Sequence, residues 1–220
     1  MPGVWATLAN VPELFVHVEA NPSVIYAGLP EWIGGAYVVP TELTTSVIDR
    51  PPHGGCREWR SWLWALGAYD GGNSEVRVTL QGNANNTVLV DGLLIQVIER
   101  NDLEGHLLQC PVGGADVRVR SLQADLDLEP CVVNFRDDLG EFSAPFAFTL
   151  ARGEVEVFHI TASTTRRCLW TAELLLIVDG KRRRMYIDDD GQPFRTSGID
   201  GLPTSTWSVR DQDWLHRGTG

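Results

Sequence analysis

Two aspartate–glycine turns in the second half of the chain constrain its fold more than any other feature. The apolar run Leu174–Val178 leads into Asp179–Gly180, and the β-prone run Lys181–Ile187 leads into Asp188–Gly191. A two-residue hairpin turn of type I′ needs positive φ at both central residues, so an Asp-Gly pair between such runs is a strong hairpin signal. The pattern therefore predicts antiparallel β structure around these turns.

Alternating apolar and polar residues extend the β pattern toward the N-terminus. Val76, Val78 and Leu80 alternate with polar residues, as in a half-buried strand. About eight such runs follow one another at spacings of roughly 8–12 residues. This pattern predicts an all-β fold, an antiparallel β-sandwich of the immunoglobulin-like kind, with a jelly roll as the alternative. The antibody pattern of Cys, Trp and Cys is not clearly present.

Residues 57–67 are the best candidate for a helix. Four apolar residues fall on one face at helical spacing: Trp59, Trp62, Leu63 and Leu66. Gly67 can end the helix because glycine accepts the left-handed backbone found at helix C-termini. The segment is short, so tertiary packing rather than intrinsic propensity must stabilise it.

Irregular composition at both ends predicts three parts. Residues 1–56 are expected to form an N-terminal extension with short strands that packs on the main domain. Residues 57–196 are expected to form the sandwich. Residues 197–220 are rich in Gly, Pro, Ser and Thr, and we expect a coil tail that lies over the sandwich.

The charge of the chain excludes several classes of partner. The 220 residues carry 29 acidic and 18 basic side chains, a formal net charge of −11. Such a surface repels phosphate backbones and anionic lipid, which disfavours nucleic-acid and membrane binding. No run of about 18 apolar residues is present, and the N-terminal residues do not resemble a secretory signal. We therefore expect a cytoplasmic protein.

The four cysteines have no metal-binding spacing. Cys56, Cys110, Cys131 and Cys168 form no Cys-x-x-Cys pair, which argues against a zinc ribbon. Without a secretory signal, the sequence favours reduced and mostly buried thiols. The alternative is one disulfide, for which Cys110 and Cys131 are the candidates.

Several short segments between residues 55 and 196 carry a family resemblance. They are Trp62…Ala65…Gly67-Ala68, Val76–Gly82, Val88–Val90, Cys110-Pro111…Gly113-Gly114, Gly153–Phe158, Asp188–Gly191 and Pro193–Thr196. Together they resemble a β-rich domain of uncharacterised actinobacterial proteins. The resemblance implies a fold and a compartment rather than an activity.

No catalytic constellation emerges from the sequence. Carboxylates gather in residues 124–141, but nothing places two of them across a cleft as glycoside hydrolysis requires. His53-Gly54-Gly55 resembles the start of an oxyanion loop, yet the Gly-x-Ser-x-Gly elbow is absent. Asp188 and Asp190 are weak metal candidates, since carboxylates at a solvated hairpin turn are equally expected. We expect no catalytic residue and no cofactor.

Eight tryptophans are many for a chain of this length. Exposed tryptophan can stack on sugar rings or anchor a protein partner. Trp59, Trp62 and Trp170 suit a core. The tryptophans off the helix face or in irregular regions are the interface candidates: Trp32, Trp64, Trp207 and Trp214.

Lys181–Arg184 is the one dense basic run of the sequence. On a strand, Arg182 and Arg184 share one face, while Lys181 and Arg183 share the other. Neither face can then be core, so we expect this strand at a sheet edge, where charge also discourages aggregation. The run can pair with the acidic segment 124–141 or bind an acidic partner through Arg182 and Arg184.

These features favour a non-enzymatic binding or protein-interaction module. One alternative is a carbohydrate-binding module or glycan-acting enzyme that uses tryptophan platforms and carboxylates. Another is a structural subunit of a larger assembly, whose extended termini reach neighbouring subunits. The expected partner is a protein, and a homo-oligomer stays open.

Overall fold

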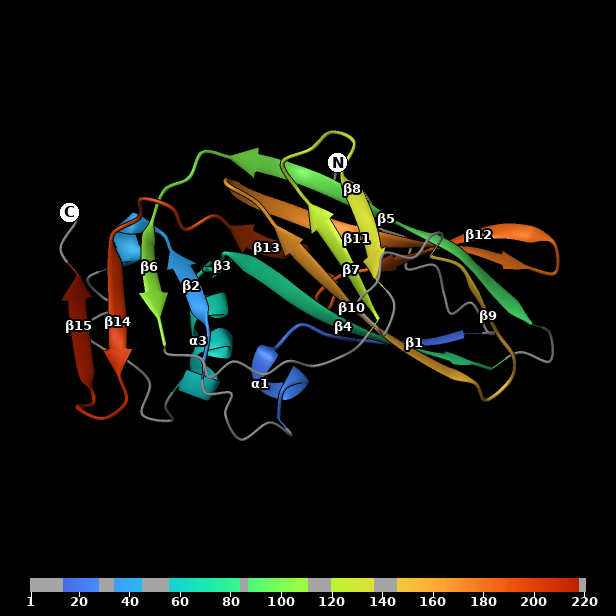
Figure 1. The fold of residues 1–220 in the computed structure, drawn as a ribbon, viewed down its shortest axis with the longest axis horizontal. Coiled ribbons are helices and arrows are strands. Elements are labelled where there is room, and N and C mark those ends of the chain that lie inside the picture. The colour runs from blue at the N-terminus through green and yellow to red at the C-terminus, as the bar shows by residue number, and fades with distance from the viewer. Residues whose placement is uncertain are drawn as a thin grey trace, which may run out of the picture.

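The computed structural model describes residues 14–27, 34–44, 56–83, 87–110, 120–136 and 146–217. Most of these residues form strands, and the strands lie in two sheets (Figure 1). The prediction of an all-β fold is confirmed.

Among the described residues, the smaller sheet has five strands, and its order shows that residues 14–19 belong to it. The order is β1 (Leu14–Glu19), β4 (Asn73–Gly82), β10 (Val155–Ser163), β7 (Ser121–Asp125) and β8 (Val132–Arg136). β1 pairs with β4 along its whole length, from Leu14 opposite Gly82 to Glu19 opposite Arg77. Residues 14–19 are thus an edge strand of the sandwich itself.

The larger sheet has ten strands. Its main path is β15 (Asp213–Arg217), β14 (Thr204–Ser208), β6 (His106–Gln109), β2 (Ala36–Val39), β3 (Tyr69–Gly71), β13 (Phe194–Ser197), β11 (Arg167–Val178), β5 (Val88–Asn101) and β9 (Phe148–Leu150). The tenth strand, β12 (Lys181–Ile187), pairs with β11 beside β13. Two short helical elements, α1 (Pro22–Ile25) and η1 (Thr41–Leu43), follow β1 and β2.

The prediction of wholly antiparallel sheets is wrong at three pairings of the described strands. β7 pairs parallel with β10, β3 with β13, and β6 with β14. These strands lie far apart in sequence and no hairpin connects them, so local turn signals could not reveal their direction.

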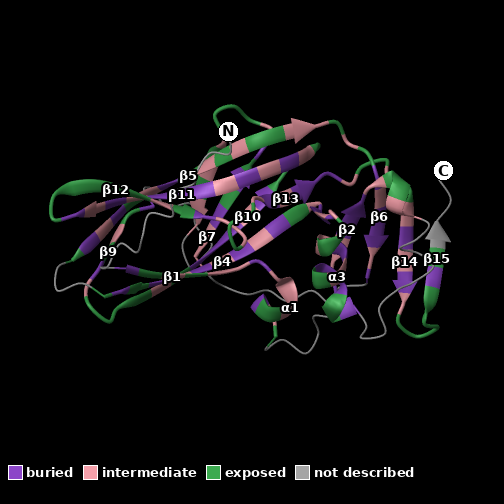
Figure 2. Ribbon diagram, turned by 180° about the vertical axis from the view of Figure 1, so that it is seen from behind, coloured by how far each residue is buried: buried purple, intermediate pink, exposed green. Residues whose placement is uncertain are grey.

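The main core fills the space between the two sheets, as the buried segments in Figure 2 show. Trp170 of β11 is fully buried at its centre, and its ring lies 4.6 Å from that of Phe194. The indole Nε1 donates a hydrogen bond of 2.8 Å to Thr196 Oγ1. This bond satisfies the polar atom of the side chain, so the large ring stabilises the core without leaving a buried donor unpaired.

A second apolar cluster lies around the predicted helix. The helix is confirmed as α3 (Trp59–Ala65), preceded by η2 (Cys56–Glu58) and followed by Gly67 at φ 82°. Trp59 is buried, and its ring lies 6.3 Å from that of Trp207 and 5.2 Å from that of Trp214.

The expected coil tail is wrong for residues 204–217. β14 and β15 form an antiparallel hairpin that places Trp207 opposite Trp214. Cross-strand aromatic pairs stabilise such hairpins, and here both rings also pack on Trp59. The tail is therefore part of the larger sheet.

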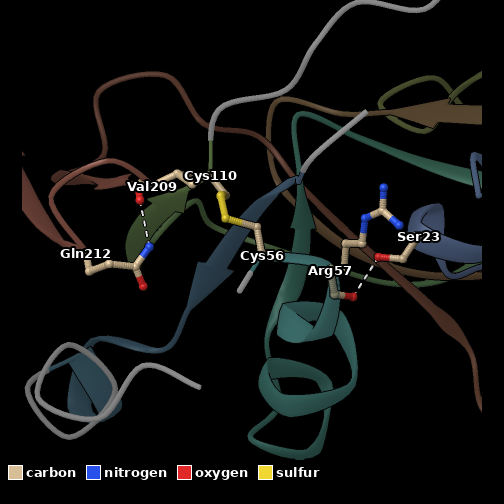
Figure 3. The surroundings of a disulfide bond; sticks show 6 residues. All are labelled: Ser23, Cys56, Arg57, Cys110, Val209 and Gln212. Atoms are coloured by element: carbon tan, nitrogen blue, oxygen red, sulfur yellow. Dashed lines mark hydrogen bonds between the residues drawn. A yellow bond between two sulfur atoms is a disulfide. The ribbon is translucent and has the colours of Figure 1, made fainter. Parts of the chain in front are cut away.

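A disulfide joins Cys56 to Cys110 and thereby links η2 to the end of β6 (Figure 3). The expectation of reduced thiols is wrong for this pair, and so is the candidate pairing of Cys110 with Cys131. Cys131 is a free thiol that packs against the main core, whereas Cys110 lies in the second cluster. Sequence spacing carries no information about this separation.

The Asp179–Gly180 hairpin is confirmed, and it forms for the expected reason. Asp179 and Gly180 have φ values of 52° and 71°, and Val178 lies opposite Lys181. β12 pairs only with β11 among the described strands, so the basic run lies at a sheet edge as predicted.

The Gly180→Ala substitution should lower the free energy of unfolding by about 1 kcal/mol. A Cβ at Gly180 would meet nothing within 4 Å, so the loss comes from the left-handed backbone that L-residues disfavour. Gly92→Ala in β5 is the matched control, because its Cβ would make only an ordinary contact of 3.7 Å with Leu175. Urea unfolding measures both variants, and an equal loss in the two would contradict this explanation.

Candidate functional site

The basic edge strand β12 is the most distinctive surface of the molecule. Its side chains from Lys181 to Arg184 are all exposed, at the end of the molecule where the β11–β12 hairpin projects (Figure 1). Arg184 Nη1 lies 3.4 Å from Glu173 Oε2 of β11. Within the described residues, Lys181, Arg182 and Arg183 make no ion pair.

The predicted pairing of this run with the acidic segment 124–141 is not found in the described part of that segment, residues 124–136. Residues 137–141 lie outside the described residues. Among the residues that the structure describes, the one acidic contact of the run comes from its own hairpin partner, β11, and all four basic side chains are exposed.

The outer face of this hairpin combines charge with apolar surface. Arg184 lies opposite Leu175 and Tyr186 opposite Glu173, and Glu173 is in turn opposite Leu94 of β5. Tyr186 is 52% and Leu94 is 47% exposed, which is high for large apolar side chains. We call the exposed side chains Arg182, Arg184, Tyr186 and Leu94 the outer β12 surface.

Glu173 lies at the centre of this surface and is only 7% exposed. Its Oε2 interacts with Arg184, but its Oε1 has no hydrogen-bond partner among the described residues. Burying a carboxylate with an unpaired oxygen is costly. Arg184 therefore has two roles: it compensates the charge of Glu173, and it remains 66% exposed at its side chain to contact other groups.

The far end of β12 is anchored by a buried arginine. Arg60 of α3 places Nη2 at 3.2 Å from Asp189 Oδ2, in the turn that follows β12, and Nε at 3.7 Å from Asp70 Oδ1 of β3. Arg60 and Asp70 are 7% and 6% exposed. We call Arg60, Asp70 and Asp189 the Arg60 cluster.

Hydroxyl groups connect the Arg60 cluster to the main core. Ser74 Oγ donates a hydrogen bond of 2.9 Å to Asp70 Oδ2 and lies 2.6 Å from Thr196 Oγ1, which accepts the bond from Trp170. Burial raises the pKa of Asp70 to about 6, although the charge of Arg60 and the Ser74 hydrogen bond oppose the shift. Burial also raises the pKa of Tyr37, and the charge of Asp70 adds to that effect.

Trp64 covers the Arg60 cluster rather than standing free. Its half-buried ring lies 4.2 Å from the guanidinium carbon of Arg60 and 4.7 Å from that of Arg195. Arg195 Nη1 also donates a hydrogen bond of 3.1 Å to the Trp64 carbonyl oxygen. Such cation–π contacts stabilise a cation that has been removed from water.

The other predicted binding tryptophans do not join this surface. Trp207 and Trp214 are 7% and 8% exposed in the second cluster, because they form a cross-strand pair packed on Trp59. Their burial corrects the expectation that these rings offer an exposed binding platform. Trp32 lies outside the described residues.

The aspartate turn itself is held by local bonds. Asp188 Oδ1 accepts a hydrogen bond of 2.8 Å from Gly191 N, and Asp190 has a φ of 52°. Asp189 is the member of the run that reaches Arg60. Among the residues that the structure describes, no group of three or more His, Cys, Asp or Glu side chains could hold a metal ion.

A shallow hollow of about 320 Å³ lies on the smaller sheet. Its lining is polar apart from one alanine: Gln123, Ala124, Asp125, Asn134, Thr161 and Ser163. Amide and hydroxyl groups of this kind can bind sugar hydroxyls, but this lining contains no aromatic ring on which a sugar could stack. The hollow and the exposed β12 surface lie on different sheets.

Sequence reasoning missed the Arg60 cluster because its members are distant in the chain. Arg60 follows Trp59 inside the helical pattern, and nothing local marks it as buried.

None of the helices in the described ranges is long and apolar enough to cross a membrane. Comparison of the chain with protein-family models and with curated proteins finds no match.

The Asp70→Asn substitution should remove a pH dependence of stability. The pKa of Asp70 is about 6 in the folded protein against an ordinary value of 3.8, so the folded state binds this proton more tightly. The group therefore stabilises the fold below about pH 4, and about 3 kcal/mol of that contribution is lost as the pH rises to about 6. Urea unfolding between pH 4 and 7 should show a steeper loss for the native protein than for the variant. Parallel pH profiles would contradict the assignment.

Proposed function

We propose that the chain is a non-enzymatic protein-interaction module whose partner presents acidic groups to the outer β12 surface. The observation that carries the proposal is the exposed run from Lys181 to Arg184 in a chain of net charge −11. Within the described residues, three of these four cations form no ion pair. Because three of the four side chains of the run form no ion pair with the described residues of this acidic protein, their charge is available for another molecule.

Physical chemistry supports a protein as that other molecule. A local positive patch on an acidic protein steers an acidic partner into one orientation, because the rest of the surface repels it. The exposed Tyr186 and Leu94 beside the patch add apolar area of the kind that contributes binding energy at interface centres. Arg182 and Arg184 supply planar guanidinium groups that bind carboxylates with two hydrogen bonds.

The carbohydrate alternative has weaker support. It depends on exposed tryptophan platforms, and Trp207 and Trp214 are buried while Trp64 is stacked with Arg60 and Arg195. The polar hollow on the smaller sheet is its one favourable feature. Direct contact of Trp64 with a partner, and the role of structural subunit, stay predictions.

Three finer predictions also stand as proposals. The first is an immunoglobulin-like arrangement, which the two packed sheets support and the parallel pairings oppose. The second is kinship with uncharacterised actinobacterial proteins, which rests on the sequence segments. The third is a cytoplasmic location, against which the Cys56–Cys110 disulfide weighs, because disulfides are rare in reducing compartments.

The double substitution Arg182→Glu, Arg183→Glu should weaken partner binding by about tenfold or more, since it reverses two charges of the exposed basic run, one of them on the outer β12 surface. The immobilised protein captures its partner from lysate of the source organism, and the isolated partner is then titrated against each variant. The matched control is Arg57→Glu, Arg210→Glu, which makes the same change of net charge at two exposed arginines elsewhere. Equal weakening in both double variants would reject β12 as the interface.

A further inference from the structure

The edge of β12 that faces away from β11 is a free hydrogen-bonding surface in the described structure. The edge strands that the structure describes are β1, β8, β9, β15 and β12, and β12 is the longest with seven residues. A free sheet edge presents a row of unpaired N–H and C=O groups that can pair with another chain. The backbone groups and side chains along β12 determine which chain can pair with this edge.

The hairpin register identifies the backbone groups that are free. In a hairpin with a two-residue turn, the closing pair is hydrogen-bonded, and bonded and non-bonded pairs then alternate. The closing pair is Val178 and Lys181, so Lys181, Arg183 and every second residue after them bond to β11. The N–H and C=O groups of Arg182, Arg184 and Tyr186 therefore point outward.

These three residues also carry the side chains of the outer β12 surface. A strand added at this edge would thus meet free main-chain groups and exposed side chains of the same residues. Main-chain bonds give such strand addition its affinity, and side chains at alternate positions give it specificity. On the added strand, the residues that face Arg182 and Arg184 are two positions apart.

Charge decides between the possible occupants. A second copy of this chain, paired in parallel through its own β12, would set one run of Lys181–Arg184 against the other, and antiparallel pairing along the whole strand would set Arg184 against Arg184. Like charges directly opposite each other in a sheet are destabilising, so the same run that would attract an acidic strand repels a second copy. The observations favour an acidic segment of another protein.

The strand is also fixed at both ends before any partner binds. The Asp179–Gly180 turn closes one end. At the other end, Asp189 exchanges backbone hydrogen bonds of 2.8 and 3.1 Å with Gln192, and its side chain reaches Arg60. A pre-organised edge needs little further ordering on binding, which lowers the entropic cost of association.

We propose that β12 binds an extended acidic segment of its partner by strand addition, with acidic side chains at alternate positions opposite Arg182 and Arg184. This inference rests on the proposed function and specifies its mode of binding. The partner segment forms main-chain hydrogen bonds with Arg182, Arg184 and Tyr186, and its carboxylates contact the two guanidinium groups.

The test uses a capped eight-residue peptide of alternating glutamate and threonine, titrated calorimetrically against the full chain. Arg182→Gln removes one charge, whereas Arg182→Pro removes the same charge and the outward N–H while leaving the bonds to β11 intact. We expect the Kd to rise about threefold for Arg182→Gln, the value of one exposed ion pair. For Arg182→Pro we expect a further rise of about fivefold, the value of one hydrogen bond.

A second peptide keeps the inference testable if Arg182→Pro disturbs the hairpin. It has the same sequence with N-methyl groups on alternate residues, which leave its charge unchanged and block strand pairing along one edge or the other according to their phase. Both phases are titrated against the native chain, and at least one should bind about 25-fold more weakly than the unmethylated peptide, as expected for two lost hydrogen bonds of about fivefold each.

The outcomes separate this inference from the proposed function. Equal Kd values for Arg182→Gln and Arg182→Pro, together with equal binding of all three peptides, would overturn strand addition and leave docking by charge in place. Absence of peptide binding, while the captured partner still depends on Arg182 and Arg183, would also overturn strand addition alone. If the captured partner is insensitive to the charge reversal, the proposed function itself fails.

Discussion

The arrangement of α3 and β12 on the larger sheet depends on the ion pairs of the buried Arg60 guanidinium group. It links α3 to β3 through Asp70 and to the turn between β12 and β13 through Asp189. Removing one partner of a buried ion pair costs about 3–5 kcal/mol, because the remaining charge stays uncompensated away from water. The buried charge of Arg60 therefore helps to position β12, the strand that carries the exposed basic run.

The Arg60 cluster also lies where two packing regions meet. On one side, Ser74 and Thr196 join it to Trp170 in the main core. On the other side, Arg60 follows Trp59, which packs in the second cluster with the β14–β15 hairpin. The hydrogen bond from Arg60 to Asp189 is directional, whereas apolar contacts are not, so it restricts how α3 sits on the sheet.

Local signals in the sequence predicted the local structure. Asp179 and Gly180 define their hairpin because the turn requires positive φ, and the helical spacing of Trp59 and Leu63 defines α3. Both signals act between near neighbours, and the edge position of β12 follows from charge on both of its faces. The same reasoning predicts Arg182 and Arg184 at an exposed edge, where the structure places them.

The features that sequence reasoning missed all join distant parts of the chain. Cys56 meets Cys110, Arg60 meets Asp189, and β14 continues the sheet beside β6. No periodicity or turn motif encodes which distant segments approach each other. Trp207 and Trp214 show the consequence, since only the position of Trp59 explains why their rings are buried.

The Cys56–Cys110 bond encloses α3, β3, β4, β5 and β6, and thus strands of both sheets, in one covalent ring across a separation of 54 residues. Closing a loop of that size restricts the unfolded chain and adds about 4 kcal/mol to stability on the chain-entropy account. The oxidation state of the surroundings thereby changes the free energy of unfolding, so thiol reductants lower the stability of the same fold that displays the cationic edge.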